Sequence, residues 1–181
     1  ACLSQRDHQL VEGFLMELGN YEQVTTGVGI NDFVRAVSAD CYTFIGEEET
    51  AFAIRDQLIA RKTDNAAVYV DQAKALMAQQ KHQLAIDVIN KAKQNKTYND
   101  HTTSIEAKAL QAMGDSLGAE RLLAAKMQSN VKNRAIYNDL ALLYSAKDIP
   151  QTSLKLIEQA KDNRAADQHT TSIEAKALHA I

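Results

Sequence analysis

A ten-residue segment, HTTSIEAKAL, occurs twice in this chain, at residues 101–110 and at residues 169–178. The two copies start 68 residues apart, which is twice 34. Repetition at an interval of a few tens of residues is typical of repeat proteins, in which each unit packs mainly against its neighbours. This interval constrains the fold more strongly than any local pattern in the chain.

The composition predicts that the repeated unit is helical. Residues that break helices are scarce, with seven glycines and a single proline, Pro150, among 181 residues. No segment sustains the alternation of polar and apolar residues that a half-buried β-strand shows. Alanine, the best helix former, is abundant. We therefore expect an all-α fold.

A 34-residue frame set on the duplicated decamer places small residues at fixed positions. The eighth position is alanine in every unit, and the twentieth is alanine or serine wherever a unit contains it. Small residues that face each other let two antiparallel helices approach to roughly 8–10 Å. Larger residues at positions 11 and 24 then fill the space between successive pairs. Pro150 falls at the start of a second helix, where proline is tolerated. The frame predicts a stack of helix hairpins.

This pattern resembles the tetratricopeptide repeat (TPR), a 34-residue helix–turn–helix unit. In the clearest copy, residues 66–99, the expected residue types stand at Tyr69, Ala73, Leu76, Ala85, Ile89 and Ala92. The resemblance spans residues 32–181 and implies an all-α, right-handed superhelical array of antiparallel helix hairpins, an α-solenoid. It has departures: the usual proline at position 32 is missing, and Arg55 occupies an apolar position, which predicts a looser first hairpin.

The frame also predicts the organisation of the chain. Its units are residues 32–65, 66–99, 100–133 and 134–167, followed by a terminal helix at residues 168–181. The terminal helix either caps the array or begins a repeat that continues in a longer protein. Residues 1–31 fit less well and are interpreted as a degenerate half-repeat. It would comprise a helix that ends in a turn at Gly19-Asn20-Tyr21 and a glycine loop at residues 25–29. That loop lacks the Lys-Ser/Thr of a phosphate-binding loop.

The sequence contains no recognisable motif for catalysis or metal binding. The five histidines and two cysteines form no pair at metal-ligand spacing, and no nucleophile motif is visible. We therefore predict a non-enzymatic protein with no metal and no cofactor. A net charge of −3 and a pI near 6.0 do not provide the basic face that nucleic-acid binding requires. No apolar run is long enough to cross a bilayer.

The resemblance implies a groove for a partner peptide or helix, because positions 2, 5, 9, 12 and 13 of the first helices face ligands in this family. Carried over to this sequence, the partner-binding residues are Phe33, Asp40, Phe44, Val70, Lys74, Met77, His101, Lys108, Gln111, Asn138, Leu142 and Lys176. Three lysines share position 9. They either bind acidic groups of a partner or are ordinary solvated lysines paired with nearby Asp or Glu. The residues of the family's carboxylate clamp for chaperone C-termini do not stand at the matching positions.

The resemblance thus implies a protein–protein interaction scaffold, with its oligomeric state open. Ala-Cys followed by Leu-Ser-Gln resembles what remains at a bacterial lipoprotein cleavage point, so Cys2 is a candidate lipidation site and the one expected membrane link. On that interpretation the chain is similar to TPR lipoproteins of the bacterial periplasm and outer membrane that assist pilus or secretion-system assembly. The alternatives are an arbitrary start of the sequence before Cys2, a cytoplasmic adaptor or chaperone, and a regulatory or sensor module cut from a larger enzyme or transcription regulator.

Overall fold

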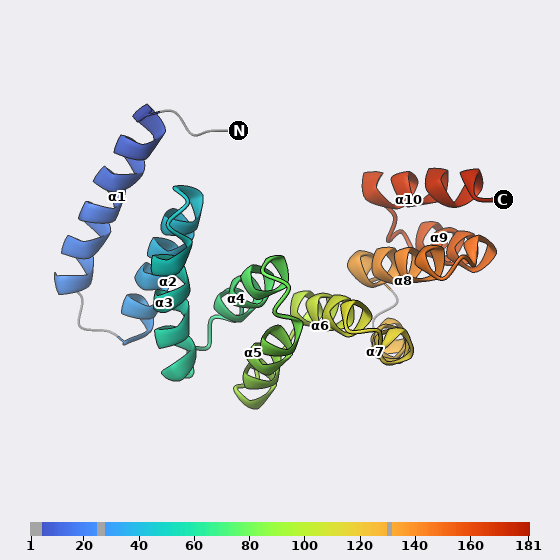
Figure 1. The fold of residues 1–181 in the computed structure, drawn as a ribbon, viewed down its shortest axis with the longest axis horizontal. Coiled ribbons are helices and arrows are strands. Elements are labelled where there is room, and N and C mark those ends of the chain that lie inside the picture. Colours follow the sequence, from blue (N-terminus) through green and yellow to red (C-terminus); the bar gives the residue numbers. More distant parts are fainter. Residues whose placement is uncertain (1–4, 25–27, 130–131) are drawn as a thin grey trace.

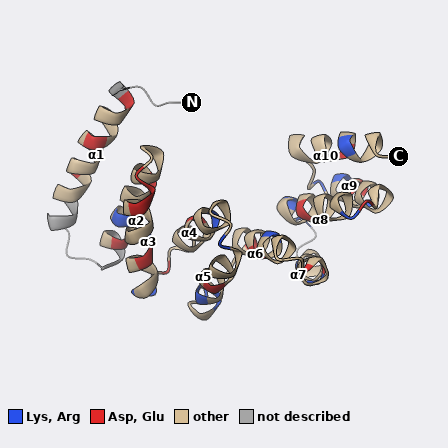
Figure 2. Ribbon diagram, viewed as in Figure 1, with Lys and Arg blue, Asp and Glu red and all other residues tan. Residues whose placement is uncertain are grey.

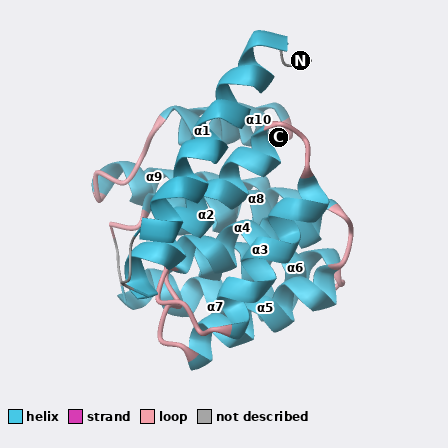
Figure 3. Ribbon diagram, turned by 90° about the vertical axis from the view of Figure 1, so that its left-hand side faces the viewer, coloured by secondary structure: helices cyan, strands magenta, loops and turns pink. Residues whose placement is uncertain are grey.

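The computed structural model describes residues 5–24, 28–129 and 132–181. Within these ranges the chain forms ten helices and no strand (Figures 1 and 3), so the all-α prediction is confirmed. The helices are α1 (Gln5–Val24), α2 (Val28–Phe44), α3 (Glu48–Ala60), α4 (Ala66–Ala78), α5 (His82–Gln94), α6 (Asp100–Ala112), α7 (Ser116–Ser129), α8 (Arg134–Ala146), α9 (Pro150–Asp162) and α10 (Gln168–His179).

The helices stack as a series of hairpins. The closest packing is between α2 and α3, α4 and α5, α6 and α7, and α8 and α9. We call α2, α4, α6, α8 and α10 the first helices, and α3, α5, α7 and α9 the second helices. The first helices from α4 onward begin at Ala66, Asp100, Arg134 and Gln168, which are the first residues of the 34-residue frame. The array is extended, with α1 and α10 at opposite ends (Figure 1).

The turn inside each hairpin passes through one residue in the left-handed region, and these residues are also 34 positions apart. They are Gly46, Gln80, Gly114 and Asp148, with φ of +86°, +60°, +88° and +59°. Glycine adopts this conformation without strain, whereas Gln80 and Asp148 carry a side chain there. The repeat period is therefore present in the backbone as well as in the side chains.

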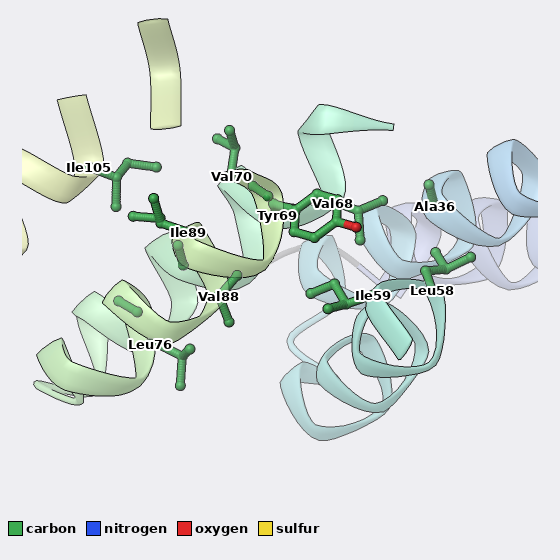
Figure 4. Close-up of a cluster of buried hydrophobic side chains, with 13 residues drawn as sticks. Ala36, Leu58, Ile59, Val68, Tyr69, Val70, Leu76, Val88, Ile89 and Ile105 are labelled. Atoms are coloured by element: carbon green, nitrogen blue, oxygen red, sulfur yellow. The ribbon is translucent and has the colours of Figure 1, made fainter. Parts of the chain in front are cut away.

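The cores of the hairpins follow the predicted small-residue contact. Ala73 of α4 and Ala85 of α5 are fully buried in one core cluster, and Ile89 fills the neighbouring space. Figure 4 shows this cluster, with labelled side chains that come from the successive helices α2 to α6. In the last hairpin the twentieth position is Ser153, which is buried and lies 3.0 Å from the hydroxyl of Ser145. The polar hydroxyl is thus satisfied inside the contact.

Both copies of the decamer make the same contact to the preceding second helix. Lys93 of α5 donates to Glu106 at 2.5 Å, and Lys161 of α9 donates to Glu174 at 2.6 Å. Glu106 also accepts a hydrogen bond from Tyr98, whose pKa is raised, mainly by burial. The glutamate of the decamer therefore joins each duplicated helix to the hairpin before it.

One expectation for the N-terminal part is wrong, and a second is wrong for the residues that the structure describes. Gly19 and Asn20 lie inside α1, which continues to Val24, so the turn expected there does not form. Of the expected glycine loop, residues 25–27 lie outside the described residues, while Val28 and Gly29 belong to α2.

Arg55 does not loosen the first hairpin either, because α2 and α3 pack as closely as the other pairs. The Arg55 side chain is buried, and its guanidinium donates to Thr43 at 2.8 Å and to Asp40 at 3.0 Å. Because of these bonds to α2, the buried guanidinium has hydrogen-bond partners at a position where the repeat usually places an apolar side chain.

Replacing Ala107 with leucine tests the small-residue contact. Ala107 is buried, so the larger side chain should lower the free energy of unfolding by about 1–3 kcal/mol. The same change at Ala175, which is exposed at the matching position of the second decamer, should change it by less than about 0.5 kcal/mol. Urea denaturation of dilute protein, followed by circular dichroism, measures both values, and equal losses would contradict the packing described here.

The start of α10 is capped by Asp167. Its Oδ1 accepts from the backbone N–H of Thr170 at 2.8 Å, and the Thr170 hydroxyl accepts from the Asp167 N–H at 3.0 Å. Asn99 and Thr102 form the same capping box in the first copy. The bond from the Thr170 N–H is the main cause that lowers the pKa of Asp167 below its ordinary value.

Because the pKa of Asp167 is lower in the folded chain, its capping contribution is complete at neutral pH and is lost as the pH falls through the folded pKa. Asp167→Ala should destabilise α10 by about 1 kcal/mol at neutral pH. Asp167→Asn should keep the cap, as Asn99 does, and remove its pH dependence. Hydrogen exchange of the α10 amides at several pH values measures this. Equal protection in wild type and Asp167→Ala would refute the assignment.

Candidate partner-binding groove

Two cavities of similar size open between the first helices. The N-terminal cavity, of about 560 Å³, is lined by Asp40, Thr43, Phe44, Glu48, Phe52, Arg55, Asp71, Lys74, Ala75, Ala78 and Gln79. The C-terminal cavity, of about 550 Å³, is lined by Asp100, His101, Ser104, Lys108, Lys132, Asn133, Arg134, Ala135, Asn138, Asp139, Asp167 and His169. Most of the lining residues of both cavities belong to first helices or to the residues just before them.

The N-terminal cavity has an apolar floor. The ring of Phe44 is 58% exposed, and Phe52 of α3 is half-buried beside it. Ala75 and Ala78 of α4 form the facing side, and their small side chains leave room. A smaller cavity of about 200 Å³ shares Asp40, Arg55 and Asp71 with this one and is also lined by the exposed Phe33. The arrangement suits an apolar side chain of a partner.

Four of the five charged residues that line the N-terminal cavity form ion pairs within the chain. Buried Arg55 contacts Asp40 at 3.0 Å, and Lys74 contacts Asp71, three residues before it on α4, at 3.2 Å. Lys74 is otherwise open to solvent, with 63% of its side chain exposed. The Lys74 side chain is therefore paired with a nearby aspartate and still accessible to solvent.

The C-terminal cavity is polar and crossed by bonds between successive first helices. Asp139 of α8 is buried; it accepts a hydrogen bond from Ser104 and pairs with Lys108 of α6 at 3.1 Å. Asn138 donates to Asp167 at 3.4 Å and accepts from Thr170 at 2.7 Å. These contacts fix the spacing of α6, α8 and α10 along the groove.

The predicted groove residues divide into three sets by exposure. Seven are exposed: Phe33, Asp40, Phe44, Lys74, His101, Lys108 and Lys176. Three are half-buried: Met77, Gln111 and Leu142. Two are buried: Val70, which belongs to the hydrophobic core, and Asn138, which joins α8 to α10. Cys2 lies outside the described residues.

The structure brings some of these residues together and separates others. Asp40, Phe44 and Lys74 line the N-terminal cavity. His101, Lys108 and Asn138 line the C-terminal cavity. Gln111 and Leu142 line a small cavity of about 60 Å³ on the other side of Lys108. Lys176 lines none of the cavities described here.

The ligand-facing positions carried over from the family do not include two kinds of residue that line the cavities. Phe52 and Arg55 belong to a second helix, α3, so a rule about first helices does not reach them. Asp71 and Asp139 stand at position 6, outside the ligand-facing set, yet each pairs with the position-9 lysine of its cavity. The sequence could have pointed to these two aspartates, because they stand at the same position in units that are 68 residues apart.

Two other features are absent from the described residues. They contain no group of three or more His, Cys, Asp or Glu side chains placed to hold a metal ion. Among the same residues, no helix is both long enough and apolar enough to cross a membrane.

No protein-family model matches the chain, and no curated protein sequence matches it. Solved structures do. A tetratricopeptide repeat protein from Parabacteroides merdae superimposes with a TM-score of 0.74 at 16% identity, over 97% of this chain and 68% of that one. A thermophilic TPR protein from Thermus thermophilus gives 0.71 at 16% identity, over 97% and 98%.

A third structure is YrrB, described as a TPR protein with an unusual peptide-binding site. It matches with a TM-score of 0.63 at 14% identity, over 95% of this chain and 84% of that one. Identities this low are evidence about the fold. The chain has the fold of tetratricopeptide repeat proteins, as its 34-residue spacing predicts.

Proposed function

We propose that this protein is an interaction scaffold that holds an extended or helical segment of a partner protein along its first helices. The observation that carries the proposal is the pair of cavities of about 560 and 550 Å³, both lined largely by first helices. The peptide-binding site named for YrrB, which has the same fold, supports a partner of this kind.

The two cavities would recognise different parts of the partner. Phe44, Phe52 and Ala78 offer an apolar side chain a place to bury its surface, which is the main source of binding free energy. The C-terminal cavity offers hydrogen-bonding groups instead, such as His101 and Lys108. An apolar anchor followed by a polar stretch therefore fits this groove best.

Acidic groups on the partner suit the position-9 lysines. An ammonium has three N–H donors, and Asp71 or Asp139 need occupy only some of them. The side chains of Lys74 and Lys108 are 63% and 54% exposed, so the remaining donors reach solvent. A partner carboxylate would share each lysine with the aspartate already there, and would add specificity more than affinity.

The experiment uses peptides selected from a random display library on the 181-residue chain, with affinities then measured by fluorescence anisotropy. Phe44→Glu and Ala78→Glu should each weaken binding by about tenfold or more. When the apolar side chain of the peptide binds, it would remove water from the new carboxylate, and this desolvation costs free energy. Leu84→Glu is the matched control. Leu84 is an exposed residue of α5 outside both cavities, so this variant should bind like wild type.

Lys108→Glu is a poor test of the groove, because it would place a second carboxylate beside buried Asp139 and disturb the contact between α6 and α8. Lys74→Gln avoids this problem, since Asp71 is only half-buried. Selected peptides that bind Phe44→Glu, Ala78→Glu and wild type equally would refute the proposed groove.

We further propose, on the sequence around Cys2 alone, that the scaffold serves a bacterial envelope machine such as a pilus or secretion system and is anchored by a lipid at Cys2. Metabolic labelling of the natural full-length protein with a fatty-acid analogue tests the anchor. Label that disappears in Cys2→Ser would support it, and label-free wild-type protein would exclude it. In the latter case the cytoplasmic adaptor and the sensor module are the remaining interpretations.

A further inference from the structure

The N-caps of the first helices from α4 onward repeat with the 34-residue period. They are Asn65, Asn99, Asn133 and Asp167. The side chains before α4 and α6 accept a hydrogen bond from the N–H of the second helical residue. Those before α8 and α10 accept only from the third. The backbone N–H groups of Ala135 and His169, the second residues of α8 and α10, are therefore not taken up by a cap.

The C-terminal cavity opens at the start of three helices. Its lining includes His101 from the first turn of α6, Ala135 from that of α8 and His169 from that of α10. The N-terminal end of a helix carries positive partial charge and N–H donors, and both favour an anion. Three such ends at one cavity of about 550 Å³ therefore favour a negatively charged group of a ligand.

Asn133 provides independent evidence for a ligand that accepts hydrogen bonds. It lines this cavity and is only 8% exposed. Its Oδ1 accepts from the N–H of Ile136 at 3.3 Å, and because only the oxygen of the amide can accept, the other end of the amide is its NH₂ group. Within the described ranges this Nδ2 has no hydrogen-bond partner. A buried donor without a partner costs free energy, which a ligand oxygen would recover.

The aspartates of the cavity wall already have partners in the chain. Asp139 pairs with Lys108 at 3.1 Å, and Asp100 pairs at 2.8 Å with Lys126 of α7, which lies outside the lining. Asp167 accepts from the N–H that it caps. Every aspartate of the wall is thus bonded to a donor of the chain, so the cavity does not need a cation from a ligand.

Arg134 is the cation best placed for a ligand. Its side chain is 59% exposed, and its Nη1 lies 3.7 Å from Oδ2 of Asp167, which is longer than a direct hydrogen bond. Figure 2 shows basic and acidic positions close together on α8, the helix that Arg134 begins. His101 and His169, which stand at the same place in the two decamers, are also exposed at this cavity.

We propose that the C-terminal cavity binds a phosphate monoester, whose oxygens contact Arg134, Asn133 Nδ2 and the free N–H groups at the starts of α8 and α10. The donors come from several helices, so a tetrahedral group with three acceptor oxygens uses more of them than a planar carboxylate with two. The inference rests on the proposed function, since the phosphate belongs to a phosphorylated side chain of the partner segment.

Titration of the ¹⁵N-labelled chain with O-phosphoserine at constant ionic strength tests the site. The amide signals of Ala135 and His169 should shift and saturate, with a Kd of about 10 mM or lower. Arg134→Gln should weaken binding by about fivefold or more, because it removes a charge-assisted hydrogen bond. Asp167→Asn keeps a capping residue, removes the carboxylate that competes for Arg134, and should strengthen binding.

Asn133→Asp separates the cap from the donor. Aspartate still caps α8, but it replaces the Nδ2 donor with a negative charge, so saturation should be lost. Asn65→Asp is the matched control, because it makes the same change at an N-cap outside this cavity and should bind like wild type. Circular dichroism checks that both variants remain helical. Unshifted Ala135 and His169 amides in the wild type overturn the proposal, and so does an Asn133→Asp variant that binds like wild type.

Other probes identify the kind of ligand and its source. Acetate should not saturate the same amides, and acetate that binds as tightly as phosphoserine overturns the phosphate in favour of a carboxylate. A peptide selected on the groove should bind about tenfold more tightly when a serine in its polar stretch is phosphorylated. Inorganic phosphate that saturates the amides while phosphorylation adds no affinity overturns the partner as the source.

Failure of this site and failure of the groove give different results. Phe44 lines the N-terminal cavity, so Phe44→Glu should leave the response of Ala135 and His169 to phosphoserine unchanged. A chain that binds phosphoserine but no peptide contradicts the proposed function. A chain that binds peptides through Phe44 but no phosphoserine contradicts only the phosphate site.

Discussion

The fold depends on the contact between two small residues in each hairpin. Ala73 against Ala85, and Ser153 in the corresponding place of the last hairpin, let two helix backbones approach closely enough for larger side chains such as Ile89 to close the space around them. A serine is tolerated there because Ser145 satisfies its hydroxyl. Since every contact is local, one solution to the packing of a hairpin can be repeated along the chain.

The groove uses residues that also hold the fold together. Asp139 fixes α8 to α6 through Ser104 and Lys108, and the same lysine faces the C-terminal cavity. Arg55 fixes α3 to α2 and also lines the N-terminal cavity. Ion pairs within the chain therefore offset most of the charge at the N-terminal cavity and the charge of Lys108 at the C-terminal one. For the proposed partner segment, apolar surface at Phe44 and Phe52 would then contribute more to affinity than net charge does, while the lysines would contribute to selectivity.

The duplicated decamer separates the effect of a sequence from the effect of its place in the array. The contacts made toward the preceding hairpin are the same in both copies: a capped N-terminus, a lysine–glutamate pair and a buried isoleucine at Ile105 and Ile173. The contacts toward the following hairpin differ, because α6 has α7 beside it and α10 has no such helix in the described chain. The same ten residues therefore contribute more side chains to the core in α6 than they do in α10.

The sequence by itself determined the period, the all-α class and the starts of α4, α6, α8 and α10, because spacing of small residues and scarcity of helix breakers act locally. Local patterns failed at α1, where Gly19-Asn20 suggested a turn that the helix passes through, and at Arg55, whose partners lie on the neighbouring helix. Only the tertiary structure decided that Val70 is buried, that Lys108 pairs with Asp139 and that Phe52 faces a cavity. Each of these depends on how neighbouring helices are rotated against one another, a quantity set by packing across units and not by spacing within one.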